Sequence, residues 1–373
     1  MTNHSQVNLG SMAQLTKYER VMRTVRHEET DRTPVFDLLR NDATISSFAG
    51  ERLNTDDERI HGIGIGRTLD IARTTYAPQV PHEVRWPNGV VLRQERWTQW
   101  IIERPFHDMP SLVSWVKDEI ERTNAEVYDR AYAEEFHAKL ERWRDYSAQG
   151  DPTGRDDPTL YVPPSGVGLT KMYWIPGMEM FAYLKKDEPE LLDAWFEARI
   201  QAEIRRVAAI ANPKLIPVVL TYDDIAYRTN LLFAPDWLRQ HFIPRLRRLL
   251  TAWHDRDTVC IFHSDGRLWR ILDDLVSAGI DGLHPLETMA GQTIKETRER
   301  YPNLFLVGGI DASQLLVNGS PEAVRAACRK AIDDTNGTGY FLGSTTELNT
   351  AVKLENAAAM FETAWNYRAN RSN

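Results

Sequence analysis

Two apolar segments in the second half of the chain end in histidine and acidic residues. The first ends in His263-Ser264-Asp265 and the second in His284-Pro285-Leu286-Glu287. Histidine nitrogen and carboxylate oxygen are common ligands of divalent cations. Crowded carboxylates also raise one another's pKa, so that one can act as a general acid near neutral pH. Because His263 and Asp265 are two residues apart at the end of one segment, we predict that both point at one metal site or one acid–base site.

Carboxylates end the neighbouring apolar segments as well. Any one of them could cap the helix that follows, but capping explains neither His263 and His284 nor the convergence of five consecutive segments on acidic ends. We predict that the catalytic residues are His263, Asp265, Asp223 and Glu287, with a metal held by His263, Asp265 and Glu287. We predict that the substrate contacts Asp37, Arg40, Tyr222, Trp174, His284, Asp311 and Glu347. Trp174 belongs to an aromatic segment, residues 173–177, that can close over an apolar ring.

Alternation of apolar runs with helical patterns shows how these residues are positioned. The apolar runs are residues 33–39, 159–163, 215–221, 258–262, 282–285, 304–307 and 339–342. Continuous apolar runs alternating with helices are typical of parallel strands that are buried on both faces. Seven such units, with an eighth strand not identified, predict a (β/α)8 barrel of the α/β class. In such barrels the active site lies at the carboxyl ends of the strands.

Other segments complete this architecture. Thr16 and Glu19 have the spacing of a capping box, which predicts an N-terminal helix over residues 16–27. Pro87-Asn88-Gly89 lies between two alternating runs and predicts a β-hairpin insertion within residues 84–103. The glycines at 62, 64 and 66 have the wrong spacing for a nucleotide-binding loop. We predict a disordered tail over residues 1–14 and a single barrel domain over residues 15–373.

The amino-acid composition argues against several classes of partner and binding site. The net charge of −8 over 373 residues argues against nucleic acid or an anionic membrane surface as a partner. No run of 18 apolar residues and no signal-peptide pattern occur, so we expect a cytoplasmic protein. Two cysteines are too few for a disulfide framework or a cysteine-rich zinc site.

Several of these segments together resemble a known family. In chain order they are Arg32-Thr33-Pro34-Val35-Phe36, Asp223-Asp224, Phe262-His263-Ser264-Asp265-Gly266, Leu283-His284-Pro285-Leu286-Glu287, Gly308-Gly309-Ile310-Asp311 and Leu354-Glu355-Asn356. The chain resembles the uroporphyrinogen decarboxylase superfamily from residue 15 to residue 367. The resemblance implies a (β/α)8 barrel. It also implies either a true decarboxylase or a cobalamin-linked methyltransferase.

Two departures from the family patterns favour the methyltransferase branch. True decarboxylases carry Arg-Gln-Ala-Gly-Arg after the first strand, but residues 36–41 here contain the single arginine Arg40 together with Asp37. A polyanionic porphyrinogen would lose its bidentate guanidinium contacts. The thiol-activating zinc enzymes have His-x-Cys where this chain has His263-Ser264-Asp265, and a later cysteine near Thr346. A metal held by oxygen and imidazole is harder than cysteine-bound zinc and suits an enzyme that acts on the methyl donor.

The sequence therefore predicts a methyltransferase that demethylates a small, methoxylated aromatic substrate. The cofactors expected are a divalent metal such as zinc and a corrinoid (cobalamin) on a separate partner protein, with folate as the other acceptor. Superfamily barrels can form homodimers. The alternative is a cofactor-free decarboxylase of an aromatic or pyrrolic acid, in which Asp37 or Asp223 would stabilise a protonated ring. A third hypothesis is a non-catalytic barrel that binds a small ligand or a corrinoid carrier.

Overall fold

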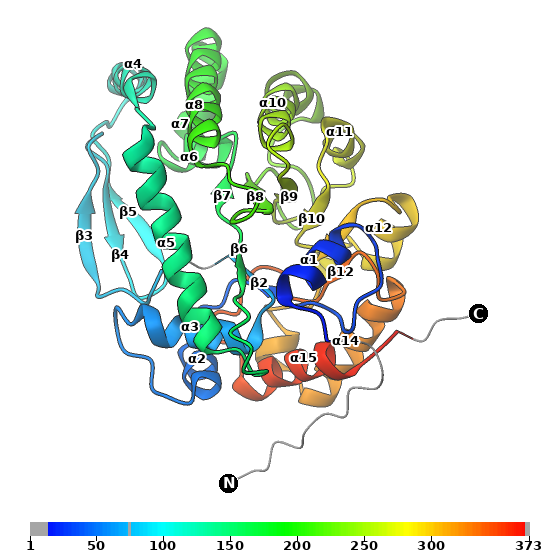
Figure 1. Cartoon of the computed structure of the whole chain (residues 1–373). Helices are drawn as coiled ribbons and strands as arrows, with labels where there is room; N and C mark the ends of the chain where they lie inside the picture. Colours follow the sequence, from blue (N-terminus) through cyan, green and yellow to red (C-terminus); the bar gives the residue numbers. More distant parts are fainter. Residues whose placement is uncertain (1–13, 74–75, 370–373) are drawn as a thin grey trace.

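The protein has a mixed α/β fold, seen here in a computed structural model that describes residues 14–73 and 76–369 (Figure 1). The predicted disordered tail, residues 1–14, lies outside the described residues except for Gln14. Among the helices that the structure describes, none is long and apolar enough to cross a membrane.

Nine short parallel strands form two sheets. In the three-stranded sheet the order is β1 (Phe36–Asp37), β2 (Ile71–Ala72) and β6 (Leu160–Tyr161). In the six-stranded sheet the order follows the chain, through β7 (Pro164–Ser165), β8 (Val218–Tyr222), β9 (Val259–His263), β10 (Gly282–His284), β11 (Phe305–Val307) and β12 (Tyr340–Phe341). Each of the seven apolar runs overlaps one of these strands, and β8 and β9 extend one residue beyond their runs, so the predicted strands are confirmed.

The two parallel sheets meet at both of their edges. β6 ends at Tyr161 and β7 begins at Pro164 on the same stretch of chain. At the other edge Val35 forms a parallel bridge with Leu342, and the Phe36 N–H donates to the Leu342 carbonyl at 2.9 Å. The strand that the sequence did not identify is β2. Its two apolar residues lie between Asp70 and Arg73, so no apolar run of greater length marks it.

Helices surround the parallel strands (Figure 1). In the first half they are α1 (Lys17–Val25), α2 (Asp42–Ala49), α3 (Glu58–Thr68), α4 (Met109–Ala125), α5 (Arg130–Gln149), α6 (Leu169–Trp174) and α7 (Met178–Asp187). In the second half they are α8 (Pro189–Ile210), α9 (Pro235–Trp237), a π-helical turn (Leu238–Phe242), α10 (Ile243–His254), α11 (Leu272–Ala278), a 3-10 turn (Thr288–Ala290), α12 (Ile294–Arg300), α13 (Leu315–Asn318), α14 (Pro321–Asp334) and α15 (Leu354–Asn366).

Local sequence signals account for two of these helices. At the start of α1, Thr16 and Glu19 form the predicted capping box. The glycines at 62 and 66 lie within α3, where a Cβ atom would collide with Tyr146 or Ser147 of α5. The glycine run therefore lets two helices approach closely, which explains its presence without a nucleotide.

An antiparallel sheet is inserted after β2. It consists of β3 (His82–Arg85), β4 (Val91–Gln94) and β5 (Gln99–Glu103). The predicted hairpin around Asn88-Gly89 is confirmed between β3 and β4, and β5 extends it to three strands. The insertion contacts the region after β7, since Arg104 Nε donates to the Ile175 carbonyl at 2.5 Å.

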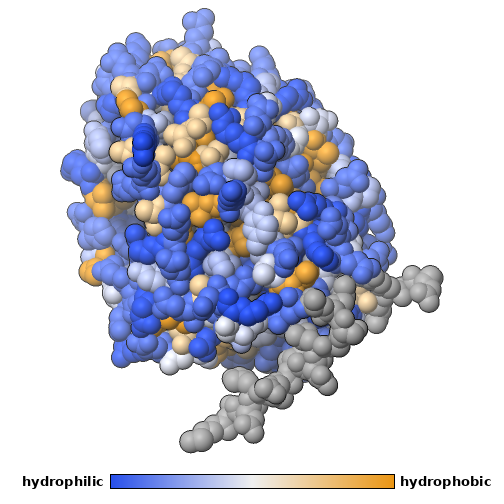
Figure 2. All heavy atoms as spheres, viewed as in Figure 1, coloured by the Kyte–Doolittle hydropathy of each residue, from blue (hydrophilic) through white to orange (hydrophobic). Residues whose placement is uncertain are grey.

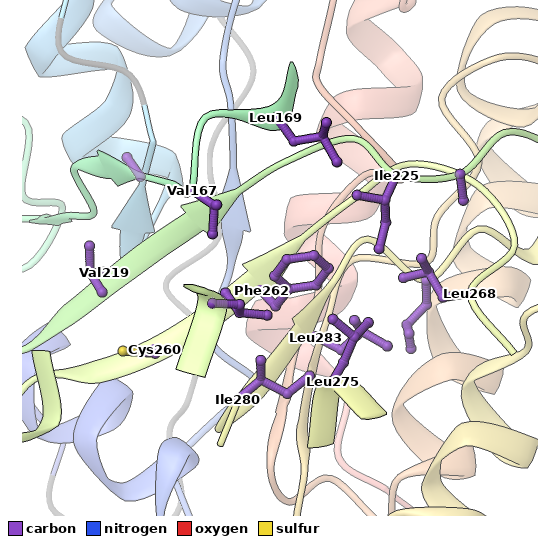
Figure 3. Close-up of a cluster of buried hydrophobic side chains, with 14 of the residues drawn as sticks. Val167, Leu169, Val219, Ile225, Cys260, Phe262, Leu268, Leu275, Ile280 and Leu283 are labelled. Carbon is purple, nitrogen blue, oxygen red and sulfur yellow. The ribbon is translucent and has the colours of Figure 1, made fainter. Parts of the chain in front are cut away.

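The parallel strands are buried on both faces, as predicted. One cluster contains alternate residues of many strands, among them Phe36, Ile71, Leu220, Ile261 and Phe341. The intervening residues belong to a larger cluster that the helices cover; Figure 3 shows Phe262 and Leu283 near Leu275 of α11, with Val219 and Cys260 farther to the left. By contrast, hydrophilic residues dominate the surface seen in Figure 2, with apolar side chains scattered among them.

Candidate active site

The carboxyl ends of β8, β9 and β10 bring three polar side chains into register. Tyr222 pairs with His263, and His263 pairs with His284. Because side chains alternate along a strand, Tyr222 and His263 share a face with Leu220 and Ile261, two members of the cluster that contains alternate strand residues. The polar residues therefore continue that cluster outward, to the end of the strands where a barrel enzyme places its chemistry.

Asp224, His263 and Asp265 form a compact group of metal-ligand type. One ligand atom from each of them lies within 4.8 Å of the other two. His263 Nε2 lies 3.7 Å from Asp224 Oδ1 and 3.8 Å from Asp265 Oδ1. The histidine is buried, with 2% of its side chain exposed, whereas Asp265 is 39% exposed. The group is therefore anchored at its imidazole and accessible at a carboxylate.

Neighbouring groups orient the two carboxylates. The Tyr222 hydroxyl donates to Asp224 Oδ2 at 2.8 Å, and the Asp265 backbone N–H donates to Asp224 Oδ1 at 3.0 Å. The Thr346 hydroxyl donates to Asp265 Oδ1 at 3.3 Å. Groups that hydrogen-bond to ligands in this way fix the ligand geometry and tune its basicity.

The imidazoles of His263 and His284 share a hydrogen bond. Their Nδ1 atoms are 2.6 Å apart, so one ring donates and the other accepts. Burial, reinforced by the Arg73 charge, lowers the pKa of both histidines well below the usual value, so both rings are neutral. When His263 is the donor, its Nε2 carries a free lone pair beside Asp224 and Asp265. This is the tautomer that a metal ligand or general base needs.

Burial also makes the carboxyl groups at this end weak acids. It raises the pKa of Asp265 to about 7, with further contributions from the negative charges of Asp224 and Glu287. It raises the pKa of Glu287 as well, although the Gly266 N–H bond opposes the shift. A carboxyl group with a pKa near 7 can exchange a proton at neutral pH, and a bound cation would favour its ionised form.

Asp223 and Asp224 have different positions. The Asp223 carboxylate accepts backbone N–H bonds from Val167 at 2.8 Å, Gly168 at 3.1 Å and Thr170 at 2.8 Å, which occupies both of its oxygens. It thereby holds the loop between β7 and α6. Asp224, which the sequence analysis did not assign to the site, is the residue that faces His263. The two-residue period of a strand, which gives Tyr222 and Asp224 the same face, could have identified it.

Glu287, proposed above as a metal ligand, stands outside the Asp224–His263–Asp265 group and accepts the Gly266 N–H at 2.9 Å. The Asp311 carboxylate caps its own turn, with bonds from the backbone N–H groups of residues 313, 314 and 315. Glu347 forms an ion pair with Arg40 at 2.7 Å. These contacts give Glu287, Asp311 and Glu347 structural partners within the chain, and their roles at the site stay predictions.

Asp37 and Trp174 were also predicted to contact the substrate. Asp37 is buried at the end of β1 and accepts bonds from the Ser344 N–H at 2.9 Å and the Ser344 hydroxyl at 2.8 Å. Burial nevertheless raises its pKa to about 7. Trp174, at the end of α6, packs edge-on against Trp86 of the antiparallel insertion, with ring centroids 6.4 Å apart. The insertion and α6 therefore support one another beside the strand ends.

Arg73 is a residue of this region that the sequence analysis missed. It directly follows β2, and its backbone N–H donates to the Asp37 carbonyl. Its guanidinium carbon lies 5.0 Å from the centroid of the Tyr222 ring. Because β2 was not recognised as a strand, no pattern placed Arg73 at a strand end.

A second group of ligand-type residues lies at the opposite end of the strands. His254, Cys260 and Asp281 also have ligand atoms within 4.8 Å of one another. Here His254 Nε2 is already bonded to Asp281 at 2.8 Å, and the cysteine belongs to the apolar cluster. Among the residues that the structure describes, these are the two groups that could hold a metal ion.

Comparison with known proteins supports the family resemblance. The sequence model of the uroporphyrinogen decarboxylase (URO-D) family matches residues 186–367. A methyltransferase from Methanosarcina mazei is similar in structure, with a TM-score of 0.66 and 16% identity, over 94% of this chain and 98% of that chain. A B12-independent methionine synthase from Shewanella sp. W3-18-1 gives a TM-score of 0.34 and 12% identity, over 86% and 84% of the two chains. No curated protein sequence matches this chain.

Proposed function

Because the chain carries a uroporphyrinogen decarboxylase family domain, we propose that it is a methyltransferase that demethylates a small methoxylated aromatic substrate. The methyl acceptor is the Co(I) corrinoid of a separate protein, or a folate. The fold shared with the M. mazei methyltransferase is consistent with this reaction. The observation that carries the proposal is the Asp224–His263–Asp265 group at the carboxyl ends of the strands.

The scaffold proposed is a closed (β/α)8 barrel. The bridge between Val35 and Leu342 joins the first strand to the last, and β6 and β7 then count as two parts of one interrupted strand. With that count the ring contains eight parallel strands. In such a barrel the loops after the strands surround one central mouth, which brings Asp37, Arg73, Tyr222, His263 and His284 towards a common substrate.

The donor set suits a divalent cation such as zinc. His263 supplies one nitrogen, and Asp224 and Asp265 supply one carboxylate oxygen each, with Tyr222 and Thr346 bonded to the carboxylates. Both cysteines of the chain are fully buried in the apolar core, so neither supplies a thiolate at this site. Oxygen and imidazole donors make a hard site that fits an oxygen-containing substrate better than a thiol. A bound cation would act there as a Lewis acid towards the ether oxygen.

Demethylation breaks the bond between the ether oxygen and the methyl carbon. The bonding pair stays with the oxygen, while an electron pair of the acceptor forms the new bond to carbon. The oxygen then needs a proton, because a free phenoxide is a poor leaving group. A bound cation would stabilise the leaving oxygen directly. Without a cation Asp265 can deliver that proton, since its pKa is raised to about 7 and its carboxylate is partly exposed. In the tautomer in which His263 Nδ1 donates to His284, the His263 Nε2 lone pair faces Asp224 and Asp265 and is available to a cation.

The test uses the purified protein, Co(I) cobalamin and a panel of methoxylated aromatics. We expect the absorbance of methylcobalamin to appear with at least one substrate, and to disappear with the variants His263→Ala and Asp224→Ala. Failure to form methylcobalamin, with folate also inactive as the acceptor, would contradict the proposal.

Decarboxylation of an aromatic or pyrrolic acid is the second candidate, because of Asp37. This carboxyl group is buried at the mouth with a pKa raised to about 7, and it can stabilise a positively charged ring intermediate when it is ionised. Release of CO2 from an aryl carboxylic acid in the absence of any corrinoid, with loss in Asp37→Asn, would establish this reaction in place of methyl transfer.

A further inference from the structure

Arg73 is a cation near the mouth of the strands, and no ion pair joins it to an acid among the described residues. It follows β2, and its side chain is half-buried over the Tyr222 ring. Among residues 14–73 and 76–369, no hydrogen-bonding or ion-pair partner of its guanidinium is found. We propose that Arg73 binds a carboxylate of the substrate, so that the methyl donor is a methoxylated arenecarboxylate rather than a neutral ether. This inference rests on the proposed function and names its substrate class.

Arg40 is a second arginine at this end of the strands, and it differs from Arg73 because it forms an ion pair. It too lies at this end of the molecule and contacts an aromatic ring, with its guanidinium carbon 5.3 Å from the centroid of Tyr76. Arg40, however, donates to Glu347 at 2.7 Å and is thereby neutralised within the chain. Of the two arginines, Arg73 is therefore the one that remains available to a ligand.

The nearest acid does not neutralise Arg73 either. Asp224 attracts the guanidinium electrostatically, but its two oxygens accept from the Tyr222 hydroxyl and the Asp265 N–H. Burial lowers the pKa of Arg73, which shows that its surroundings disfavour an isolated positive charge. Arginine still stays protonated at neutral pH, so a ligand anion relieves this cost.

Arg73 and His263 both adjoin the ring of Tyr222. The Arg73 guanidinium carbon lies 5.0 Å from the Tyr222 ring centroid, and the His263 ring centroid lies 5.1 Å from it. A substrate ring that binds between these two groups would direct a carboxylate to Arg73 and a methoxy group to His263. The guanidinium fork matches the two oxygens of a carboxylate.

The charge of the mouth favours a monoanion. The negative charges of Asp224 and Glu287 lie close enough to add to the effect of burial on the pKa of Asp265, and the charge of Asp224 does the same for Glu287. These acids would repel a dianion such as a phosphate monoester more strongly than they repel a carboxylate. One unpaired arginine balances one negative charge, which is the charge of an arenecarboxylate at neutral pH.

Calorimetric titration of the full chain with benzoate and with benzamide, without corrinoid, tests the inference. Benzamide has the shape of benzoate but no charge. We expect benzoate to bind the wild-type protein at least about tenfold more tightly than benzamide, since hydrogen bonds to charged groups contribute about 1.5–3 kcal/mol. Arg73→Gln should abolish this preference, and Arg73→Lys should restore part of it.

Arg256→Gln serves as the matched control. Arg256 lies between α10 and β9, at the other end of the strands, and donates to the Ala252 carbonyl at 2.8 Å. This variant should bind benzoate like the wild type. Circular dichroism and thermal unfolding check that Arg73→Gln is folded, while the benzoate–benzamide comparison on the wild type needs no variant.

Three results would overturn the inference: benzoate does not bind, benzamide binds as tightly as benzoate, or Arg73→Gln binds benzoate unchanged. The two proposals fail separately. A benzoate preference that depends on Arg73, in a protein that forms no methylcobalamin, would refute methyl transfer alone. Conversely, equal turnover of methoxybenzoates and neutral methoxybenzenes, with Arg73→Gln as active as wild type, would refute the carboxylate site alone.

Discussion

The residues on either side of β2 show how differently the two ends of the strands treat charge. Asp70 precedes the strand and is fully buried, with Arg20 at 2.7 Å, Arg32 at 2.7 Å and the Val35 N–H at 2.9 Å. Arg73 follows the strand, and the structure shows it no ion-pair partner among the described residues. The charge of Asp70, at the amino end of β2, is therefore neutralised by neighbouring arginines. The charge of Arg73, at the carboxyl end, remains available to a ligand.

The pKa values of the aspartates also differ between the two ends of the strands. The Arg32 and Arg20 charges hold the pKa of Asp70 well below its usual range, against the effect of burial. At the carboxyl end burial prevails, and it raises the pKa of both Asp37 and Asp265 to about 7. The comparison indicates that the amino end stabilises the fold and the carboxyl end keeps charges available for chemistry. The experiments below test this division, beginning with the largest effect.

Asp70→Asn should destabilise the fold most. The substitution leaves buried Arg20 with Asp31 alone and half-buried Arg32 without an acid, and breaking a buried ion pair costs about 3–5 kcal/mol. Urea denaturation measures this loss. Asp224→Asn, at the carboxyl end, is the matched control and should change the free energy of unfolding by less than about 1 kcal/mol. Equal losses in both variants would remove the distinction between the two ends.

His263→Ala should have the largest effect on turnover. Removing a proposed ligand should reduce methyl transfer by more than the roughly 10- to 100-fold loss that is typical when a residue bonded to a ligand is removed. The rate of methylcobalamin formation measures it. His254→Ala, in the ligand-type group at the amino end, should leave that rate unchanged. If turnover falls in His254→Ala and not in His263→Ala, the reaction occurs at the amino end of the strands, which contradicts the proposed site.

Tyr222→Phe tests the support of the site and should have a smaller effect. The variant keeps the ring near His263 and Arg73 but removes the hydroxyl that donates to Asp224. We expect the affinity for zinc to fall by about 10- to 100-fold. Competition with a chromophoric chelator measures that affinity. An unchanged affinity would show that Asp224 needs no orientation by Tyr222.

Asp37 should give the smallest effect, a change of stability with pH. Its pKa is about 7 in the folded chain, against an ordinary value of 3.8, so the folded state binds more protons between these values. Its contribution to stability is present below about pH 4 and is lost as the pH rises through about 7. Between about pH 6 and about pH 8, wild type should therefore lose on the order of 1 kcal/mol relative to Asp37→Asn. Parallel urea curves for the two proteins across this range would refute the shift.

Local sequence signals predicted much of this fold. The apolar runs located seven strands, because strands buried on both faces leave continuous apolar segments. The strand β2 left no such signal, since Asp70 and Arg73 flank only two residues. His263 and Asp265 were placed together correctly by their spacing. The sequence analysis assigned Asp223 to the site in place of Asp224. The two residues follow β8, and only Asp224 is in phase with Tyr222, whose side chain faces the site.

Contacts between distant segments could not be derived from local pattern. Asp37 binds Ser344 and Arg40 binds Glu347, each across about the whole length of the chain. Such pairs depend on the approach of the first strand to the last, which no segment encodes by itself. The sequence predicted His284 only as a second histidine at a strand end. Its hydrogen bond to His263 follows from the register of β9 and β10.

Zinc titration of chelator-treated protein tests the central claim most directly, because it needs no knowledge of the substrate. The account predicts that the wild-type chain and His254→Ala each bind one zinc ion, and that His263→Ala and Asp224→Ala lose this binding. Zinc binding that survives in both of these variants but is lost in His254→Ala would contradict it, as would a wild-type chain that binds no zinc.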